Sequence, residues 1–163
     1  LRAAGVDDVV CVEPGTRRQA LARAVGATSV VDPANLVVPS IAEPGLVVDG
    51  AVDVAIECSG RAPAMEAALA QLHRGGTLVL VGSGIDPPRF DPNRIVLNEV
   101  VVTGAFTYDD GGFEAALELL ASGGLPVDAL LEPDDVPLAG TLAAMQALAE
   151  GRLAGKVLVD PRR

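Results

Sequence analysis

Short apolar runs alternate with amphipathic stretches along most of the chain. Runs rich in Val, Ile and Ala that stop at Gly, Pro or a polar residue are typical of buried strands, and apolar residues at helical spacing that end at Gly indicate helices. The pattern predicts strands over residues 6–13, 29–31, 52–58, 77–81 and 100–105, a short edge strand over 95–97, and a closing strand over 156–159. It predicts helices over residues 16–25, 63–73, 113–120 and 141–148, and a loop with at most one weak helix over 34–50.

Strands and helices that alternate in this way, joined by short turns containing glycine, predict a parallel sheet covered by helices on both faces. Right-handed crossover connections turn such a chain into a doubly wound α/β fold of the Rossmann type. Ligands of these folds bind at the carboxyl ends of the strands. The positions of interest therefore follow the predicted strands, at Glu13, 58–60, 82–84 and 105–106.

The composition favours one folded domain and excludes several partners. Half of the 163 residues are hydrophobic, with three Phe, one Tyr and no Trp. The formal net charge of −10 would repel a phosphate backbone, so we expect no nucleic-acid partner. No apolar run approaches the roughly 20 residues of a membrane span, so we expect a cytoplasmic protein with no membrane partner.

The two cysteines indicate the redox compartment, and the first residues indicate whether the chain is part of a longer protein. Cys11 and Cys58 each lie in an apolar run and lack the spacing of a metal-binding pair, so we interpret them as small core residues in a reducing compartment. Residues 1–5 resemble the last turn of a helix with Gly5 as its stop. We therefore expect a fragment of a longer protein.

Glu13 is the most informative side chain. It ends a predicted buried strand just before Pro14, where a carboxylate can accept hydrogen bonds from both hydroxyls of a ribose. The same charge would repel a 2′-phosphate, which favours NAD over NADP. Arg18 follows in the first turn of the next predicted helix, from which it can return over the ribose. The alternative interpretation is that Glu13 caps this helix and that Arg18 is solvated.

The remaining chemical signals are weaker. Gly82, Ser83 and Gly84 follow a predicted strand and would let a ligand approach the backbone, although many such turns bind nothing. Lys156 is either a ligand contact or a solvated lysine of an edge strand. No nucleophile–base set surrounds the single His73, and neither a P-loop nor a G-x-G-x-x-G motif occurs. The sequence thus offers no catalytic residue and no metal ligand.

Several segments follow one another in an order that is more specific than any one of them. They are residues 9–14, 21–27 leading to 31–33, 52–60, 75–82, 102–106, Ala115, Leu117 and Leu120 with Ser122 and Gly123, and 155–159. Together they resemble the zinc-type medium-chain alcohol dehydrogenase family from its second strand onward. The resemblance covers nearly the whole chain. The turn at Glu13 and Pro14 is most similar to the branch of polyol, butanediol and threonine dehydrogenases.

The resemblance implies which residues hold NAD. Glu13 and Arg18 would bind the adenosine ribose, and Lys156 would bind the pyrophosphate, where an Arg would be the closer match. Pro14 and Ser59 would flank the adenine, with Arg61 at the rim of the pocket. Backbone groups would orient the nicotinamide carboxamide, at Val81, Ser83, Ala105 and Thr107. The strand-end residues complete the expected cofactor-binding set, with Cys58, Gly60 and Gly82.

The resemblance also implies how the parent protein is organised. Residues 1–106 would form a partial dinucleotide-binding domain, and residues 107–163 would rejoin the catalytic domain. Residues 94–98 would be an edge strand that pairs two subunits, so we expect a homodimer or tetramer formed through residues 94–104. The first strand and its glycine-rich loop would lie between the strands that end at Glu13 and Cys58. Both of these strands lack that neighbour here and would keep an open edge.

The implied parent enzyme transfers hydride between NAD and a secondary alcohol or polyol, with zinc polarising the oxygen. In relatives the zinc ligands, the proton relay and most of the substrate pocket precede the glycine-rich loop, so we expect these 163 residues to be inactive alone. Two other interpretations stay open. The chain could be a methyltransferase that uses S-adenosylmethionine (SAM), because those enzymes also hold a ribose with an acidic residue, or a truncated dimerisation module without catalysis.

Overall fold

The computed structural model describes all residues, Leu1 to Arg163. The chain divides into two compact units, one made of residues 1–35 and 109–163 and the other of residues 36–108. Each unit is described by itself below. No helix in the chain has the length and apolar character that a membrane span requires.

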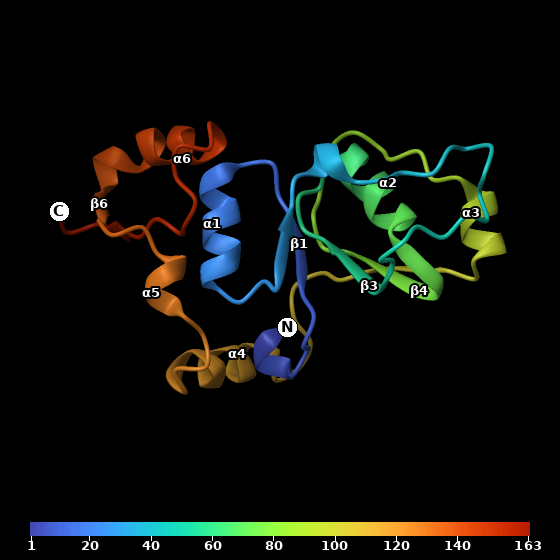
Figure 1. Ribbon diagram of the computed structural model, residues 1–163. Coiled ribbons are helices and arrows are strands. Elements are labelled where there is room, and N and C mark those ends of the chain that lie inside the picture. Colours follow the sequence, from blue (N-terminus) through green and yellow to red (C-terminus); the bar gives the residue numbers. More distant parts are fainter. The chain divides into compact units, whose positions relative to one another are not determined.

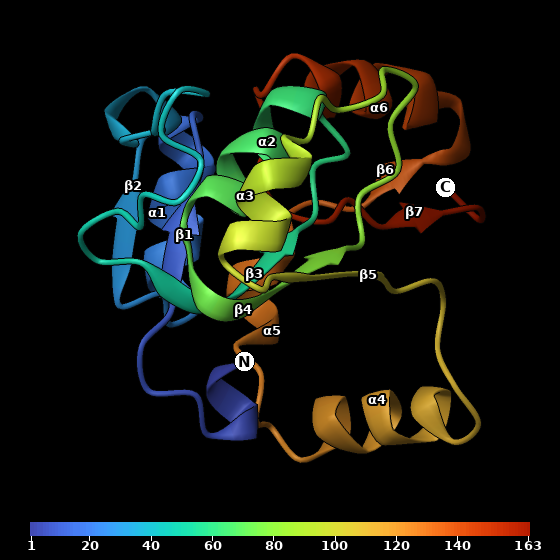
Figure 2. The ribbon, with the colours of Figure 1, turned by 90° about the vertical axis from the view of Figure 1, so that its right-hand side faces the viewer.

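The unit of residues 36–108 contains a three-stranded parallel sheet in the order β3-β4-β5. Figure 2 shows β3 (Val52–Glu57), β4 (Leu72–Leu80) and β5 (Val101–Gly104) side by side. Glu57 is paired with Leu80, and Leu80 with Gly104, so the three strands end next to one another. This edge of the sheet is where a parallel fold places its ligands.

Helix α2 (Ala62–Ala70) connects β3 to β4 and packs on both strands. Its Leu69 joins Leu72, Leu78 and Val100 in the core of the unit, and Leu78 is fully buried. Burying a leucine side chain contributes roughly 1.5–3 kcal/mol, so this cluster is a main source of the unit's stability. Partly buried hydrophobic residues surround the cluster, at Val52, Ala55, Ala68, Leu80, Phe90, Ile95 and Val102.

The unit of residues 1–35 and 109–163 contains two small parallel strand pairs. Figure 1 labels its helices α1, α4, α5 and α6. β1 (Val10–Val12) is paired with β2 (Ser29–Val31), and α1 (Thr16–Ala24) connects them. β6 (Val136–Pro137) is paired with β7 (Val159–Asp160), and α6 (Thr141–Ala149) lies between them in the chain. The remaining elements are α4 (Gly112–Ala121), α5 (Val127–Leu130), and the 3-10 turns η1 (Arg2–Ala4), η2 (Pro33–Asn35) and η3 (Leu138–Gly140).

The parallel pairing of all these strands confirms the predicted α/β class. The strands nevertheless form three separate sheets rather than one. β1 is paired only with β2, and β3 only with β4, so each keeps one edge without a strand partner. That an absent strand belongs at these edges stays a prediction, as do the domain limits at residue 106.

The edge strand predicted over residues 95–97 is wrong, because these residues belong to α3 (Pro92–Leu97). The carboxylate of Asp91 accepts a 2.9 Å hydrogen bond from the backbone N–H of Asn93, and Pro92 occupies the first turn. An N-cap and a proline at this position both favour a helix. Three apolar residues in a row do not by themselves distinguish a strand from a helix.

Three smaller predictions also need correction. The helix over residues 63–73 ends at Ala70, and β4 begins at Leu72, because the backbone N–H of Val52 donates to the carbonyl of Gln71 at 2.8 Å. Cys58 is exposed rather than part of the core, and Cys11 is only partly buried. The closing strand is shorter than predicted, since Lys156 forms an isolated bridge with Leu131.

Candidate functional site

Glu13 directly follows β1 and extends its pairing, because its N–H donates to the carbonyl of Val31 at 3.0 Å. Its carboxylate Oε1 accepts hydrogen bonds from the N–H of Gly15 at 2.7 Å and from Nε of Arg18 at 2.8 Å. No hydrogen bond within the chain ends on its Oε2. The carboxylate is therefore held in one orientation and keeps one oxygen for a ligand.

The same contacts address the alternative interpretation of these two residues. The N-cap of α1 is Gly15, and no side chain caps the helix. Glu13 therefore stabilises the turn before α1 without serving as its N-cap. Arg18 is paired with the carboxylate and is not simply solvated.

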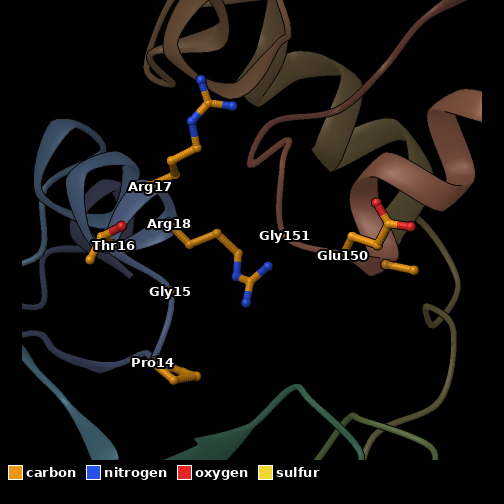
Figure 3. A pocket seen from close by; sticks show the side chains of 8 residues that line it. Pro14, Gly15, Thr16, Arg17, Arg18, Glu150 and Gly151 are labelled. Atoms are coloured by element: carbon orange, nitrogen blue, oxygen red, sulfur yellow. The ribbon is translucent and has the colours of Figure 1, made fainter.

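A hollow of about 340 Å³ lies beside this ion pair (Figure 3). Figure 3 shows the side chain of Arg18 directed towards Gly151, and a Cβ atom at Gly151 would lie 3.8 Å from its Nη1. Arg17 is directed away and donates a hydrogen bond to the carbonyl of Arg152. Both arginines line the hollow, and Arg18 is the one whose side chain extends towards Gly151. The hollow is lined by the start of α1 and the end of α6, with Pro14, Gly15, Thr16, Arg17, Arg18, Ala149, Glu150 and Gly151.

Lys156 lies in the same unit but does not line this hollow. Its N–H donates to the carbonyl of Leu130 at 2.7 Å, and its carbonyl accepts from the N–H of Glu132 at 2.8 Å. The carboxylate of Glu132 accepts from the N–H groups of Ala154 and Gly155, and these bonds lower the pKa of Glu132 below its ordinary value. The backbone at Lys156 is therefore well held, while its exposed side chain makes no ion pair.

In the unit of residues 36–108, the turn of residues 58–60, predicted to border the adenine, contacts the turn of residues 82–84, which contains the predicted nicotinamide contact Ser83. Cys58, Ser59 and Gly60 follow β3, and Ser83 follows β4. Gly60 has a φ of 71°, and a Cβ atom there would lie 2.6 Å from the carbonyl carbon of Ser83. Only glycine permits both this left-handed backbone and this close approach. The structure therefore brings together the predicted adenine-side turn and part of the predicted nicotinamide-side turn.

Val81 and Ala105 are neighbours at the ends of β4 and β5. The N–H of Val81 donates to the carbonyl of Glu57, and the N–H of Ala105 donates to the carbonyl of Leu80, both at 2.9 Å. No backbone hydrogen bond ends on the carbonyl oxygens of Val81 and Ala105. Two adjacent free acceptors fit the amide hydrogens of a nicotinamide carboxamide, so the chemistry of this edge suits the predicted cofactor.

Thr107 follows at a strained position. Its φ of 56° is one of two positive values among the non-glycine residues of the chain. A β-branched residue in the left-handed region is an outlier, and such strain is concentrated at ligand sites. The predicted cofactor residue Thr107 is therefore held in an unfavourable conformation by its surroundings.

Glu57, directly before the turn that follows β3, is a candidate residue that the sequence analysis did not identify. Glu57 is the last residue of β3 and only 5% exposed, and its carboxylate accepts hydrogen bonds from the turn. The signal was an acidic residue at the end of an apolar strand, directly before Cys58, Ser59 and Gly60. Partial burial raises the pKa of the neighbouring Cys58 thiol, and the charge of Glu57 raises it further, so this thiol is a poor nucleophile.

The chain holds no group of three His, Cys, Asp or Glu side chains that could bind a metal ion. The acceptor oxygens of Glu13, Val81 and Ala105 that no hydrogen bond within the chain reaches are suited to contacting a nucleotide.

Comparison with known proteins decides the family. The family model for zinc-binding dehydrogenases matches residues 1–122. The chain belongs to this family. The prediction of a zinc-type alcohol dehydrogenase relationship is thereby confirmed.

Relatives of this zinc-binding dehydrogenase chain are longer proteins. D-xylulose reductase from Saccharomyces cerevisiae (strain ATCC 204508 / S288c) is 34% identical over 122 residues, which are 72% of this chain and 34% of the relative. (R,R)-butanediol dehydrogenase from Bacillus subtilis (strain 168) is 35% identical over 133 residues, 80% of this chain and 37% of the relative. The chain thus spans little more than a third of their length.

Solved structures agree with these matches. The crystal structure of 2R,3R-butanediol dehydrogenase from Bacillus subtilis matches 99% of this chain and 46% of its own chain, with a TM-score of 0.80 and 32% identity. A zinc-binding dehydrogenase from Sinorhizobium meliloti 1021 bound to NADP matches 97% of this chain and 46% of its own, with a TM-score of 0.73 and 28% identity. The Rossmann-type fold class predicted from the sequence is therefore confirmed.

Proposed function

We propose that this chain is the cofactor-binding part of an NAD-dependent alcohol or polyol dehydrogenase that transfers hydride between NAD and a secondary alcohol. The observation that carries the proposal is Glu13, whose Oε1 is held by Gly15 and Arg18 while no hydrogen bond within the chain ends on Oε2. Its partners Gly15 and Arg18 both line the hollow. Such a carboxylate suits a ribose diol. The named activities of the xylulose and butanediol relatives support the substrate class.

Between the two nicotinamide dinucleotides, Glu13 favours NAD. A 2′-phosphate at the ribose would lie against a carboxylate, and this repulsion weakens NADP. Arg18 gives only partial compensation, because its Nε is already bonded to Glu13. The Sinorhizobium relative carries NADP in its structure, so the choice between the cofactors within this family has to be tested for this chain.

Calorimetric titration of the 163-residue chain with NADH, NADPH and SAM tests this proposal. We expect NADH to bind more tightly than NADPH, and SAM not to bind. Binding of SAM in place of NADH would favour the methyltransferase interpretation. Binding of neither nucleotide, together with a stable dimer, would favour a dimerisation module without catalysis.

We also propose that these residues alone do not catalyse the reaction. The chain provides no zinc site, and it spans less than half the length of the relatives named above. NAD supplies the hydride acceptor when bound, but the groups that would activate an alcohol are not among the residues described. Reduction of NAD by these 163 residues in the presence of a secondary alcohol would contradict this part of the proposal.

We propose that the protein is a homodimer or tetramer that uses β5 as part of its contact. β5 is paired only with β4, so one edge of Val101–Gly104 has unpaired backbone groups. Residues 92–97 form a helix, so only the later part of the predicted segment 94–104 offers a strand edge. Light scattering of the wild type and of Thr103→Pro tests this, and a monomeric wild type would overturn it.

We further propose a cytoplasmic location. Neither of the two cysteines follows the spacing of a disulfide framework, which suits a reducing compartment. Fractionation of cells that express the tagged protein tests this, and recovery in the secreted fraction would contradict it.

A further inference from the structure

Glu57 carries a buried carboxylate at the edge of the sheet where the candidate cofactor groups gather. It ends β3, and only 5% of the residue is exposed. A buried charge is costly unless hydrogen bonds satisfy it. The hydrogen bonds that this carboxylate accepts therefore indicate which part of the structure it stabilises.

All of these contacts go to the turn that follows β3. Oε1 accepts from the N–H of Ser59 at 2.7 Å and from the hydroxyl of Ser59, and Oε2 accepts from the N–H of Gly60 at 3.0 Å. The hydroxyl oxygen of Ser59 in turn accepts from the N–H of Arg61 at 3.2 Å. Arg61 is the N-cap residue of α2. One carboxylate thus determines the conformation of the turn up to the start of the helix.

The backbone of Glu57 holds the residues that follow the neighbouring strand β4. Its carbonyl accepts from the N–H groups of Val81 and Gly82, both at 2.9 Å. A Cβ atom at Gly82 would lie 2.7 Å from Oε2 of Glu57, so glycine there leaves room for the carboxylate. The side chain of Glu57 therefore holds residues 58–61, and its backbone holds residues 81–82.

We infer that Glu57 is a positioning residue for the adenine side of the cofactor site. This inference rests on the proposed function and on the prediction, implied by the family resemblance, that Ser59 and Arg61 border the adenine. Glu57 is buried beneath the turn and acts through it rather than on the cofactor. Because the side chain of Glu57 accepts the hydrogen bonds of Ser59 and Gly60 and its backbone accepts those of Val81 and Gly82, changing the side chain affects the adenosine half of the ligand and leaves Val81 and Gly82 in place.

The decisive variant is Glu57→Gln. A glutamine keeps the size of the side chain but replaces one acceptor oxygen with an NH₂ group, which opposes the N–H of Gly60 or Ser59. A donor left without an acceptor in a buried turn is unfavourable. We expect the turn to shift, and NADH and ADP-ribose to bind about tenfold more weakly, by the same factor, because both contain the adenosine half.

The matched control is Glu66→Gln. The carboxylate of Glu66 also accepts a backbone hydrogen bond, from the N–H of Arg89 at 2.7 Å, in the same unit of the chain. It does not contact the turn of residues 58–61. We expect this variant to bind NADH and ADP-ribose as the wild type does.

A structural role alone would lower the melting temperature without a common change in the two affinities. Amide NMR shifts of Ser59 and Gly60 show directly whether the turn has moved. Should Glu57→Gln fail to fold, the amide shift of Arg61 in Ser59→Ala decides, because this variant removes the hydroxyl between the carboxylate and Arg61 but keeps both backbone donors to the carboxylate. We expect about a threefold loss of ADP-ribose affinity for this variant.

The possible failures are distinguishable. Equal affinities of the wild type and Glu57→Gln for NADH and ADP-ribose, with the Gly60 amide shift changed, overturn the inference alone. A folded wild-type chain that binds neither ligand overturns the proposed function and the inference with it. Equal losses in Glu57→Gln and Glu66→Gln also overturn the inference, because they show a general loss of acidic groups rather than the effect of the turn.

Discussion

Arg18 lines the hollow and donates a 2.8 Å hydrogen bond from its Nε to Oε1 of Glu13, and this bond orients both side chains. The side chain of Arg18 is 40% exposed and that of Glu13 is 19% exposed. Ion pairs that remain open to solvent contribute only about 0–1 kcal/mol to folding. The main effect of this pair is therefore to orient groups for a ligand, and not to stabilise the fold.

Replacing Arg18 with alanine should weaken NADH binding by about tenfold, because Glu13 loses a charged partner that holds its carboxylate. The free energy of unfolding should fall by less than about 1 kcal/mol. Calorimetric titration and urea unfolding measure the two effects. A large loss of stability with unchanged NADH affinity would assign the pair to the fold instead.

Replacing Glu13 with alanine should reverse the cofactor preference. NADH loses the acceptor for its ribose hydroxyls, whereas a 2′-phosphate no longer meets a carboxylate and gains access to Arg18. The ratio of the NADH and NADPH dissociation constants measures this, with Glu118→Gln on exposed α4 as the control. An unchanged ratio would show that Glu13 does not contact the ribose.

The Glu132 carboxylate should make stability depend on pH in acid. Hydrogen bonds from the N–H groups of Gly155 and Ala154 lower its pKa from the ordinary value of 4.5. Its contribution is therefore complete above that ordinary value and is lost as the pH falls through the lower, folded-state pKa. Glu132→Gln should flatten this acid limb in urea unfolding, and Glu118→Gln should leave it unchanged.

Replacing Leu78 with alanine should lower the free energy of unfolding by about 2–5 kcal/mol, because the side chain is fully buried in the core and its loss leaves a cavity. Leu142 is the matched control, since it is 67% exposed. Its replacement with alanine should change stability by less than about 0.5 kcal/mol. Equal effects in urea unfolding would show that the core lies elsewhere.

Replacing Thr107 with glycine should raise the free energy of unfolding by about 1 kcal/mol, because glycine adopts a positive φ without the strain of a branched side chain. Thr103→Gly is the control. Thr103 lies within β5, where glycine should cost roughly 0.5–1 kcal/mol. A loss of stability in both variants would indicate that Thr107 makes compensating contacts.

Local signals were sufficient for several elements. Helix α1 begins at Thr16, as predicted, because apolar residues recur at helical spacing after Pro14 and Gly15. Strands β3 and β5 lie within a residue or two of their predicted limits, since Val-rich runs are buried or paired wherever they occur in an α/β chain. The segment order also carried the family, which the match over residues 1–122 confirmed.

Where two local signals competed, the prediction failed. Residues 95–97 were expected to form a strand on their apolar character, but the cap at Asp91 and the proline at Pro92 begin a helix there. Leu72 was expected to lie within the helix over residues 63–73, but its pairing with Val52 makes it the start of β4. Pairing between strands is a non-local property, so it cannot be read from one segment.

The sequence by itself determined the alternation of strands and helices, the α/β class, the family, and Glu13 as the acidic residue after the second strand of the family's fold. Only the tertiary structure decided which hydrogen-bonding groups around these positions have partners within the chain and which remain available to a ligand. It paired Arg18 with Oε1 of Glu13, buried Glu57 beneath the turn of residues 58–61, and left the carbonyls of Val81 and Ala105 adjacent. The physical reason is that periodicity reflects burial, a property of each segment, whereas hydrogen-bond partners depend on how distant segments meet.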